Sequence, residues 1–247
     1  MTEVVVGTGA YGKINVAHFR GLRVAAKSLH DVLISEYNFY IFTREMTIAS
    51  RLRHPNLLLF IGATTQGHPP IIVTELMATS LRAELTQHPL SKCQIKSIAT
   101  DIACGLNYLH QWKPQPIIHR DVSSPNVLLK PSADNNWEAK VSDYGSANFI
   151  QQISSSSVMP GNPAYAAPEA KFPSDHTAKM DVYSFGVLLF EMCLQKQPEM
   201  SIHGRARQAK LVRWDSLAEI IEECMANLPT NRPTLARVME QLQHTHV

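Results

Sequence analysis

Hydrophobic and polar residues alternate along the first third of the chain, which is typical of β-strands with one buried face. Between the third and fourth of these segments the period changes. Apolar residues from Phe39 to Leu52 recur at the spacing of one helix face, until Pro55 breaks the pattern. The first part of the chain is therefore predicted to form a small sheet with one helix. The five predicted strands lie near residues 4–6, 14–17, 24–27, 57–61 and 71–74.

Helical periodicity dominates after Ser80. Ser91 with Gln94, and Ser216 with Glu219, have the spacing of a capping box. In that motif the first side chain and the side chain three residues later bond each other's backbone N–H groups. We therefore expect two helices that begin with Ser91 and Ser216 as their N-caps.

The longest apolar stretch, residues 182–194, is interrupted by Ser184 and Glu191 and is too short to span a bilayer. It therefore predicts a buried helix and no membrane insertion.

The 247 residues, 45% of them hydrophobic, suffice for one large domain or two closely packed lobes. Lys+Arg 23 against Asp+Glu 21 argues against a nucleic-acid partner, which would require a strongly basic surface. The four cysteines form no C-x-x-C pair and indicate a reduced, cytoplasmic location.

A glycine pattern, G-x-G-x-x-G, is formed by Gly7, Gly9 and Gly12 between two predicted strands. Glycines at such positions let backbone N–H groups approach phosphates closely. A plain hairpin turn or a Rossmann dinucleotide site could show the same letters, but a Rossmann site requires a helix after the third glycine. Residues 13–17 continue as a strand instead, which favours a nucleotide-binding loop between two strands.

Acidic and amide side chains gather on two predicted loops near the middle of the chain. His119-Arg120-Asp121 is followed by Asn126, and Asp143 begins an Asp-aromatic-Gly triplet. This set supplies one acidic base and two oxygen ligands for a metal ion. Phosphoryl transfer from a metal-bound nucleotide needs such groups, because its chemistry is mostly positioning and charge neutralisation.

Together these motifs resemble the catalytic domain of a eukaryotic-type protein kinase, and the likeness runs over residues 5–242. The stretches ASRLRHPNLLLFIGA, DIACGLNYLH and DVYSFGVLLFEM are similar to those of the tyrosine-kinase-like group, whose members mostly phosphorylate Ser or Thr. The resemblance implies an α+β, two-lobed protein-kinase fold, in which a small antiparallel β-sheet lobe with one helix precedes a larger, mainly α-helical lobe. It further implies an ATP-binding lobe over residues 1–77 and a catalytic and substrate-binding lobe over residues 78–247. We therefore expect ATP, Mg²⁺ and protein substrates.

The resemblance also implies a role for each motif. Lys27 would hold the ATP phosphates, covered by the glycine loop, and would pair with Glu45 of the following helix. Asp121 would orient and deprotonate the substrate hydroxyl, while Asn126 and Asp143 would bind Mg²⁺. Thr74 would be the gatekeeper, and the segment after it the hinge. The residues implied for adenine binding are Ile14, Ala25, Thr74, Glu75, Met77 and Leu128.

Three positions depart from the family pattern. Tyr144 replaces the usual Phe and adds a hydroxyl that needs a partner when buried. Ser123 and Asn162 replace a Lys and a Thr that contact each other and the catalytic Asp in Ser/Thr kinases. We expect these two short polar groups to hydrogen-bond across the acceptor site. The prediction is a Ser/Thr kinase, with a tyrosine or dual-specificity kinase as the alternative.

A pseudokinase, which uses the fold only for interactions, is the alternative from another functional class. Inactive members usually lack one of the four central residues, and none is missing in this sequence. Glu169, Asp181 and Arg232 match structural positions of the family, with Glu169 and Arg232 expected to pair, since a buried charge needs a partner. The short segment before Gly7 suggests that regulatory domains are missing from this chain.

Two polar segments have open interpretations. Serines 154–157 are either a phosphorylation site that Arg120 binds, or a polar linker that is never modified. A run of basic residues either docks an acidic partner or forms a solvated helix face, and the usual behaviour of charge runs favours the solvated face. The members of this run are Arg205, Arg207, Lys210 and Arg213.

Overall fold

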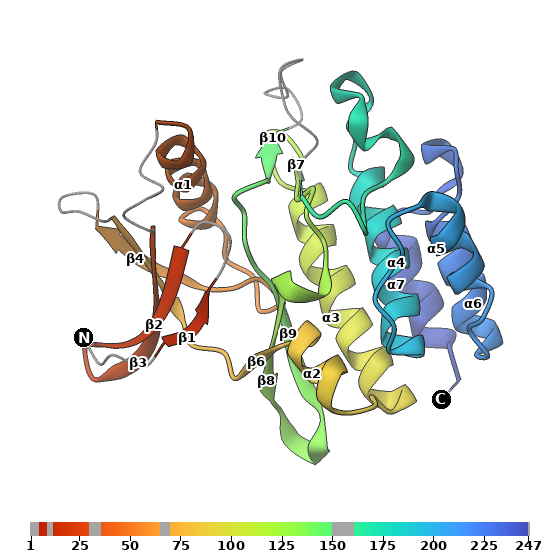
Figure 1. Ribbon diagram of the computed structural model, residues 1–247, viewed down its shortest axis with the longest axis horizontal. Coiled ribbons are helices and arrows are strands. Elements are labelled where there is room, and N and C mark those ends of the chain that lie inside the picture. The colour runs from red at the N-terminus through yellow and green to blue at the C-terminus, as the bar shows by residue number, and fades with distance from the viewer. Residues whose placement is uncertain (1–4, 9–11, 30–35, 65–69, 150–160, 247) are drawn as a thin grey trace.

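The computed structural model describes residues 5–8, 12–29, 36–64, 70–149 and 161–246, which form two lobes of different construction. Figure 1 shows a sheet with one helix at one end of the molecule and a group of packed helices at the other. This arrangement confirms the predicted α+β, two-lobed fold.

The strands of the first lobe form one antiparallel five-stranded sheet in the order β1-β2-β3-β5-β4. Helix α1 contacts this sheet through Phe42, which lies with Ile72 in a small apolar cluster. The predicted number of five strands and the single helix are confirmed. The elements are β1 (Val5–Thr8), β2 (Gly12–Phe19), β3 (Leu22–Leu29), α1 (Glu36–Ala49), β4 (Phe60–Thr64) and β5 (Ile71–Glu75).

The predicted position of the fourth strand is wrong, because β4 begins at Phe60 rather than at Leu57. Leu57 is buried and forms a parallel bridge with Val141 of the second lobe. The backbone N–H of Leu58 donates to the Val141 carbonyl at 2.9 Å. The apolar run of residues 57–61 therefore serves both lobes: its first residues join the lobes, and only its last residues enter the sheet.

The second lobe is mainly helical and carries two small antiparallel sheets on its side toward the first lobe. Its helices are α2 (Leu81–Gln87), α3 (Lys92–His110), α4 (Lys179–Leu194), α5 (Ile202–Ala209), α6 (Asp215–Cys224) and α7 (Leu235–His244). Its strands are β6 (Thr79–Ser80), β7 (Ile117–Ile118), β8 (Val127–Pro131), β9 (Trp137–Val141) and β10 (Asn148–Phe149). Short 3₁₀ helices span Ser124–Asn126, Ala133–Asn135, Pro168–Lys171, Pro173–Asp175 and Pro229–Asn231.

One of the two predicted capping boxes is present. The Ser91 side chain accepts the Gln94 N–H at 3.2 Å, and the Gln94 side chain accepts the Ser91 N–H at 2.9 Å. The other prediction is wrong, because α6 begins one residue earlier than Ser216 and has Trp214 at its N-cap. The indole of Trp214 is largely buried and donates to the His246 carbonyl at 3.0 Å, so the packing of this large side chain sets the start of the helix.

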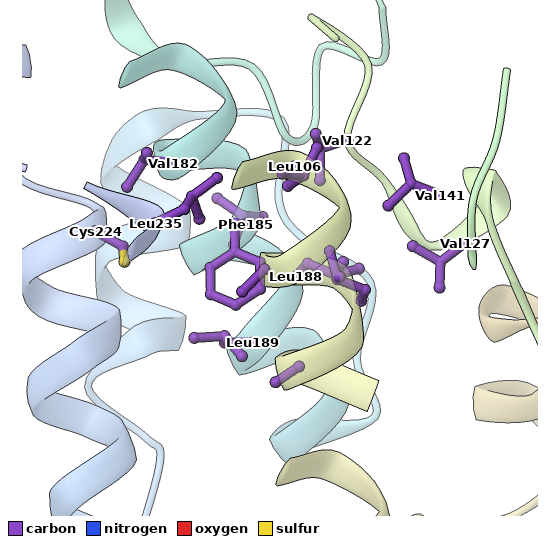
Figure 2. Packing of buried hydrophobic residues seen from close by; sticks show 14 of the residues in the cluster. Leu106, Val122, Val127, Val141, Val182, Phe185, Leu188, Leu189, Cys224 and Leu235 are labelled. Carbon is purple, nitrogen blue, oxygen red and sulfur yellow. The ribbon is translucent and has the colours of Figure 1, made fainter. Parts of the chain in front are cut away.

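Helix α4 is buried over nearly its whole length, as its apolar sequence predicted. Figure 2 shows Phe185, Leu188 and Leu189 of this helix inside a cluster that also receives side chains from α3, α6 and α7. Val122, which directly follows Asp121, belongs to the same cluster, so the loop of Asp121 is anchored in the core of the lobe. Burial of one such side chain contributes about 1.5–3 kcal/mol. Among the described residues, no helix has the length and apolar character needed to cross a membrane.

Candidate active site

Three charged side chains from separate elements meet where the two lobes face each other. The Lys27 ammonium of β3 donates to both carboxylate oxygens of Glu45 in α1, at 2.8 Å each. It also lies 3.8 Å from Oδ1 of Asp143, which follows β9. Burial opposes the charge of Lys27, but the carboxylates of Asp143 and Glu45 outweigh it and raise the pKa of Lys27. The same ammonium lowers the pKa of Asp143, so both groups are charged at neutral pH.

The predicted glycine loop lies between two strands. Gly7 is in β1 and pairs with Ile14, while Gly12 is the first residue of β2. Gly9 lies outside the described residues. Because β2 continues as a strand for eight residues from Gly12, the loop has the strand–loop–strand form and not the Rossmann form.

The apolar residues predicted for adenine binding share one face of the sheet. Ile14 lies directly opposite Lys27, and Ala25 lies directly opposite Thr74. Directly opposed residues point to the same side of a sheet, and so do Ala25 and Lys27, which are two positions apart. Leu128 in β8 comes from the second lobe, and all of these side chains are only half-buried.

The predicted hinge begins with Glu75, whose side chain joins the lobes. Its carboxylate accepts the Leu59 N–H at 2.8 Å and pairs with the Lys140 ammonium of β9 at 3.0 Å. Its own N–H donates to the Leu59 carbonyl, and its carbonyl accepts the Thr74 hydroxyl at 3.2 Å. A carbonyl oxygen has a second lone pair, so this one retains capacity for a ligand. Met77 follows, half-buried, between β5 and β6.

The loop that carries Asp121 is fixed by a buried carboxylate beneath it. Asp181 of α4 accepts the backbone N–H groups of His119 at 2.9 Å and of Arg120 at 2.8 Å. It also lies 2.8 Å from the His110 ring. Burial opposes its charge, but these bonds outweigh burial and lower the pKa of Asp181. They hold Arg120 at φ 64°, a left-handed conformation that non-glycine residues rarely adopt.

Asp121 lies at the centre of the loop and is bonded on two sides. Its Oδ1 atom accepts the backbone N–H of Asn162 at 2.8 Å. Its carbonyl accepts the Asn126 amide group at 2.9 Å, which leaves the amide oxygen of Asn126 as a potential ligand. Burial raises the pKa of the Asp121 carboxyl, although the His119 ring and the Asn162 N–H oppose the shift. A carboxylate with a raised pKa is a better proton acceptor.

Asp143 is also held in a left-handed conformation, at φ 65°, and its Oδ1 atom accepts the Gly145 N–H at 3.2 Å. Its side chain is 39% exposed, so it has room for a further ligand. Tyr144 turns into the core, where its hydroxyl donates to the Val141 carbonyl at 3.2 Å. The expectation that this hydroxyl needs a partner is confirmed. The ring of His119 lies edge-on to that of Tyr144 at 5.7 Å.

Residues 161–166, here called the acceptor loop, cover the loop of Asp121. Gly161 has φ 74°, and a Cβ atom at this position would lie 2.3 Å from the Arg120 carbonyl. The Asn162 side chain accepts the Ala164 N–H of its own loop at 3.0 Å. Ser123 is buried, and no hydrogen bond joins it to Asn162, both of which the structure describes. The predicted bond across the acceptor site is therefore wrong, because the Asn162 side chain bonds within its own loop.

A buried polar network lies beneath the acceptor loop and was not found from the sequence. The Tyr165 hydroxyl donates to Glu191 of α4 at 2.6 Å. Arg82 of α2 pairs with the same carboxylate at 3.1 Å and donates to the Tyr165 hydroxyl at 2.6 Å. Ser124 donates to Glu191 at 3.0 Å. No sequence signal marked these residues, because their spacing along the chain follows no motif.

The three residues assigned structural roles, Glu169, Asp181 and Arg232, are at their expected places. Arg232 and Glu169 form the predicted ion pair, with both side chains buried. The interpretation of the basic run is wrong for Arg205, which is 2% exposed and neither solvated nor free to dock a partner. Arg207 of the same helix is exposed, as predicted. Serines 154–157 lie outside the described residues.

A model of the family described as protein tyrosine and serine/threonine kinase matches residues 1–242. A probable serine/threonine-protein kinase of Dictyostelium discoideum is 35% identical over 247 residues, 96% of this chain and 24% of that protein. The serine/threonine-protein kinase CTR1 of Arabidopsis thaliana is 34% identical over 255 residues, 96% of this chain and 30% of that protein. The dual specificity protein kinase shkC of D. discoideum is 33% identical over 263 residues, 98% of this chain and 50% of that protein. The chain thus spans between a quarter and half of the length of these relatives.

Proposed function

The chain belongs to the protein tyrosine and serine/threonine kinase family, and we propose that it transfers the γ-phosphoryl group of ATP to Ser or Thr residues of protein substrates. The observation that carries this proposal is the meeting of Lys27, Glu45 and Asp143 between the lobes, with Asp121 on the adjoining loop. Phosphoryl transfer depends on such placement of charges.

On the nucleotide side, Lys27 would hold the phosphates in the position that its pairing with Glu45 sets. The amide oxygen of Asn126 and the charged, partly exposed carboxylate of Asp143 are the hard oxygen ligands that Mg²⁺ prefers, so these residues fit the ion. When bound, Mg²⁺ neutralises charge on the phosphates. Adenine would lie on the sheet face formed by Ile14, Ala25 and Thr74, beneath the glycines of the loop. The other proposed adenine contacts are Glu75, Met77 and Leu128.

On the acceptor side, Asp121 would accept the proton of the substrate hydroxyl. Burial supports this role because it raises the pKa of its carboxyl. The Asn162 N–H fixes one carboxylate oxygen and leaves the other for the substrate. Asp121 touches the acceptor loop directly, so the base and the surface that receives the substrate form one unit.

The preference for Ser or Thr is supported by the names of relatives, and the reaction itself by the geometry of the site. The names of the relatives include serine/threonine-protein kinases and a dual specificity protein kinase, so tyrosine transfer is the second candidate. A pseudokinase is disfavoured because Lys27, Asp121, Asn126 and Asp143 are all present. We further propose that the lobes divide at residues 77 and 78, and that the four free cysteines reflect a cytoplasmic location.

Radiolabel transfer from ATP to a degenerate peptide array with Ser, Thr or Tyr at the central position tests the proposal. Transfer to Ser and Thr peptides is expected, together with loss of transfer in the Asp143→Asn variant. Dominant transfer to Tyr would overturn the acceptor class. ATP binding without transfer to any peptide would favour a pseudokinase instead.

A further inference from the structure

Arg205 of helix α5 is almost completely buried, although arginine is rarely buried without a partner of opposite charge. Other arginines of this lobe have such partners: Arg82 pairs with Glu191, Arg207 lies 3.4 Å from Glu199, and Arg232 pairs with Glu169. Within the described ranges, no carboxylate forms an ion pair with Arg205. Some other group must therefore stabilise the buried charge of Arg205.

Backbone carbonyl oxygens surround this guanidinium group in place of a carboxylate. Its Nη1 atom donates to the carbonyls of Pro163 and Ala164 at 3.0 Å each, and its Nη2 atom donates to that of Ala166 at 2.8 Å. Nη1 also lies 3.2 Å from the carbonyl of Met200, just before its own helix. Three of these oxygens belong to the acceptor loop, so one side chain bonds half of the carbonyls of that loop, while the Tyr165 carbonyl accepts the Ser184 hydroxyl at 2.9 Å.

The ring of Tyr183 in α4 contacts both this arginine and a second buried one. The guanidinium carbon of Arg205 is 5.6 Å from the ring centroid, and that of Arg232 is 5.0 Å from it. Arg232 binds Glu169, a few residues after the acceptor loop. The two arginines thus attach both ends of residues 163–169 to the buried helix α4. Figure 1 shows α5 beside α4 and α6 at the end of the lobe remote from the sheet.

The segment that Arg205 holds is in direct contact with the proposed base. The Asn162 N–H donates to Asp121 at 2.8 Å, and the Asn162 side chain accepts the Ala164 N–H at 3.0 Å. Pro163, whose carbonyl binds Arg205, is the next residue along the chain. A displacement of this segment would therefore move both a hydrogen-bond donor of the base and the surface on which a substrate lies.

We propose that Arg205 is a positioning residue for the protein substrate, which holds the carbonyls of residues 163–166 so that the acceptor hydroxyl faces Asp121. It acts on the acceptor and not on the nucleotide, whose site lies on the other side of the base. The inference rests on the proposed kinase function. Lysine cannot replace this arginine, because a single ammonium cannot reach the several carbonyls that the planar guanidinium reaches together.

The test compares wild type, Arg205→Met, Arg205→Lys and Arg207→Met by the kcat and KM for a peptide substrate and by ATP hydrolysis without peptide. Arg207 is the matched control, since it is two residues away on the same helix and 73% exposed. Both Arg205 variants are expected to lose about 10- to 100-fold in kcat/KM for the peptide, the size of effect that misplaced reactants produce. The KM for ATP and the rate of ATP hydrolysis should stay within about twofold of wild type, and Arg207→Met should match wild type throughout.

Two results would overturn the inference. One is a peptide kcat/KM for Arg205→Met within about twofold of wild type. The other is an equal loss of ATP hydrolysis and peptide transfer, because Arg205 would then support the whole lobe rather than the acceptor loop. A wild-type protein that hydrolyses ATP but phosphorylates no peptide would instead refute the proposed function, so the two failures are distinguishable.

Hydrogen–deuterium exchange of the wild-type protein in increasing urea is a second test, which needs no variant and remains decisive if neither substituted protein folds. Because one side chain joins the two segments, the backbone N–H groups of Asn162, Ala164, Tyr165 and Ala166 and those of α5 are expected to lose protection at the same urea concentration. Loss of protection in the acceptor loop while α5 is still protected would overturn the inference.

Discussion

The two sides of the site are held together by different kinds of contact. On the nucleotide side, Lys27, Glu45 and Asp143 come from three elements and are joined by opposite charges, 2.8 to 3.8 Å apart. On the acceptor side, the chain is held through its own backbone, by Asp121 at one end and by Arg205 along its length.

This difference determines what each side can tolerate. A pair of charged side chains depends on the identity of both residues, so one substitution removes it. A loop held by its carbonyls depends on the donor that holds it and on a glycine where the backbone approaches closely. Apart from Asn162 and Tyr165, whose side chains are themselves bonded in place, the side chains along such a loop can vary without moving it. We therefore expect substitutions in the acceptor loop to be tolerated more readily than substitutions on the nucleotide side. Some of the tolerated substitutions should alter substrate preference.

The acceptor side also contains one ion pair between side chains, that of Arg232 with Glu169, and a substitution there tests the comparison. Arg232→Met leaves Glu169 buried without a partner, and we expect it to lower the free energy of unfolding by about 3–5 kcal/mol. Arg205→Met leaves no carboxylate behind and should lower it by about 1–3 kcal/mol, the desolvation penalty of the unpaired carbonyls. Urea denaturation measures both. Equal losses would contradict the distinction, and Glu169→Gln should partly restore the stability of Arg232→Met.

The next largest effect is expected on the nucleotide side. Asp143→Asn keeps the shape of the side chain and removes the charge beside Lys27, so we expect kcat to fall by about 100- to 1000-fold. The thermal unfolding temperature should change little, because the substituted side chain is partly exposed. Peptide phosphorylation with labelled ATP measures the loss. The exposed Asp175 provides a control, and Asp175→Asn should keep wild-type activity.

Among the loop residues of the acceptor side, Gly161 is the one whose substitution should reduce activity most. In Gly161→Ala the new Cβ would lie 2.3 Å from the Arg120 carbonyl, so the loop has to move away from Asp121, and peptide kcat/KM should fall by about 10- to 100-fold. Gly21→Ala is the matched control. Its φ of 81° imposes similar backbone strain, but nothing lies within 4 Å of the added atom. If both variants lost equal activity, strain rather than the close approach would be responsible.

The smallest effect concerns the departure from the family pattern at Tyr144. Tyr144→Phe removes the hydrogen bond to the Val141 carbonyl inside the core, which contributes about 0.5–1.5 kcal/mol. We expect a loss of stability of that size and activity close to wild type, because the hydroxyl points away from the site. Parallel urea denaturation and peptide assays test this. A large loss of activity with unchanged stability would show that the hydroxyl has a role in the reaction.

The same contrast explains what could be predicted from the sequence. The nucleotide side consists of side chains at fixed spacing, so Lys27, Glu45 and Asp143 could be named, and the packing of β3, α1 and the segment after β9 brings them together as expected. Alternating apolar residues likewise predicted the number of strands. The position of β4 was missed, because Leu57 pairs with the other lobe, a contact between distant segments that local periodicity does not contain.

The acceptor side could be predicted only in part. The Glu169–Arg232 pair followed from the family pattern, but Arg205 resembled any basic residue on a helix surface, and only the packing of α5 shows that it is buried. The predicted bond between Ser123 and Asn162 failed for a similar reason, since the Asn162 side chain bonds within its own loop. Every residue has a backbone carbonyl, so a contact to a carbonyl does not depend on the type of residue that supplies it. Such contacts therefore cannot be predicted from the sequence.

The most direct test of the account measures ATP hydrolysis without peptide and phosphoryl transfer to a peptide in the same two variants, Lys27→Met and Gly161→Ala. The account predicts that Lys27→Met loses both reactions, because Lys27 belongs to the nucleotide side. It predicts that Gly161→Ala loses peptide transfer and retains most of its ATP hydrolysis, because the added atom lies against Arg120 and Asp121 and leaves Lys27, Glu45 and Asp143 in place. Equal loss of both reactions in Gly161→Ala, or ATP hydrolysis that survives in Lys27→Met, would contradict the separation of the site into two sides.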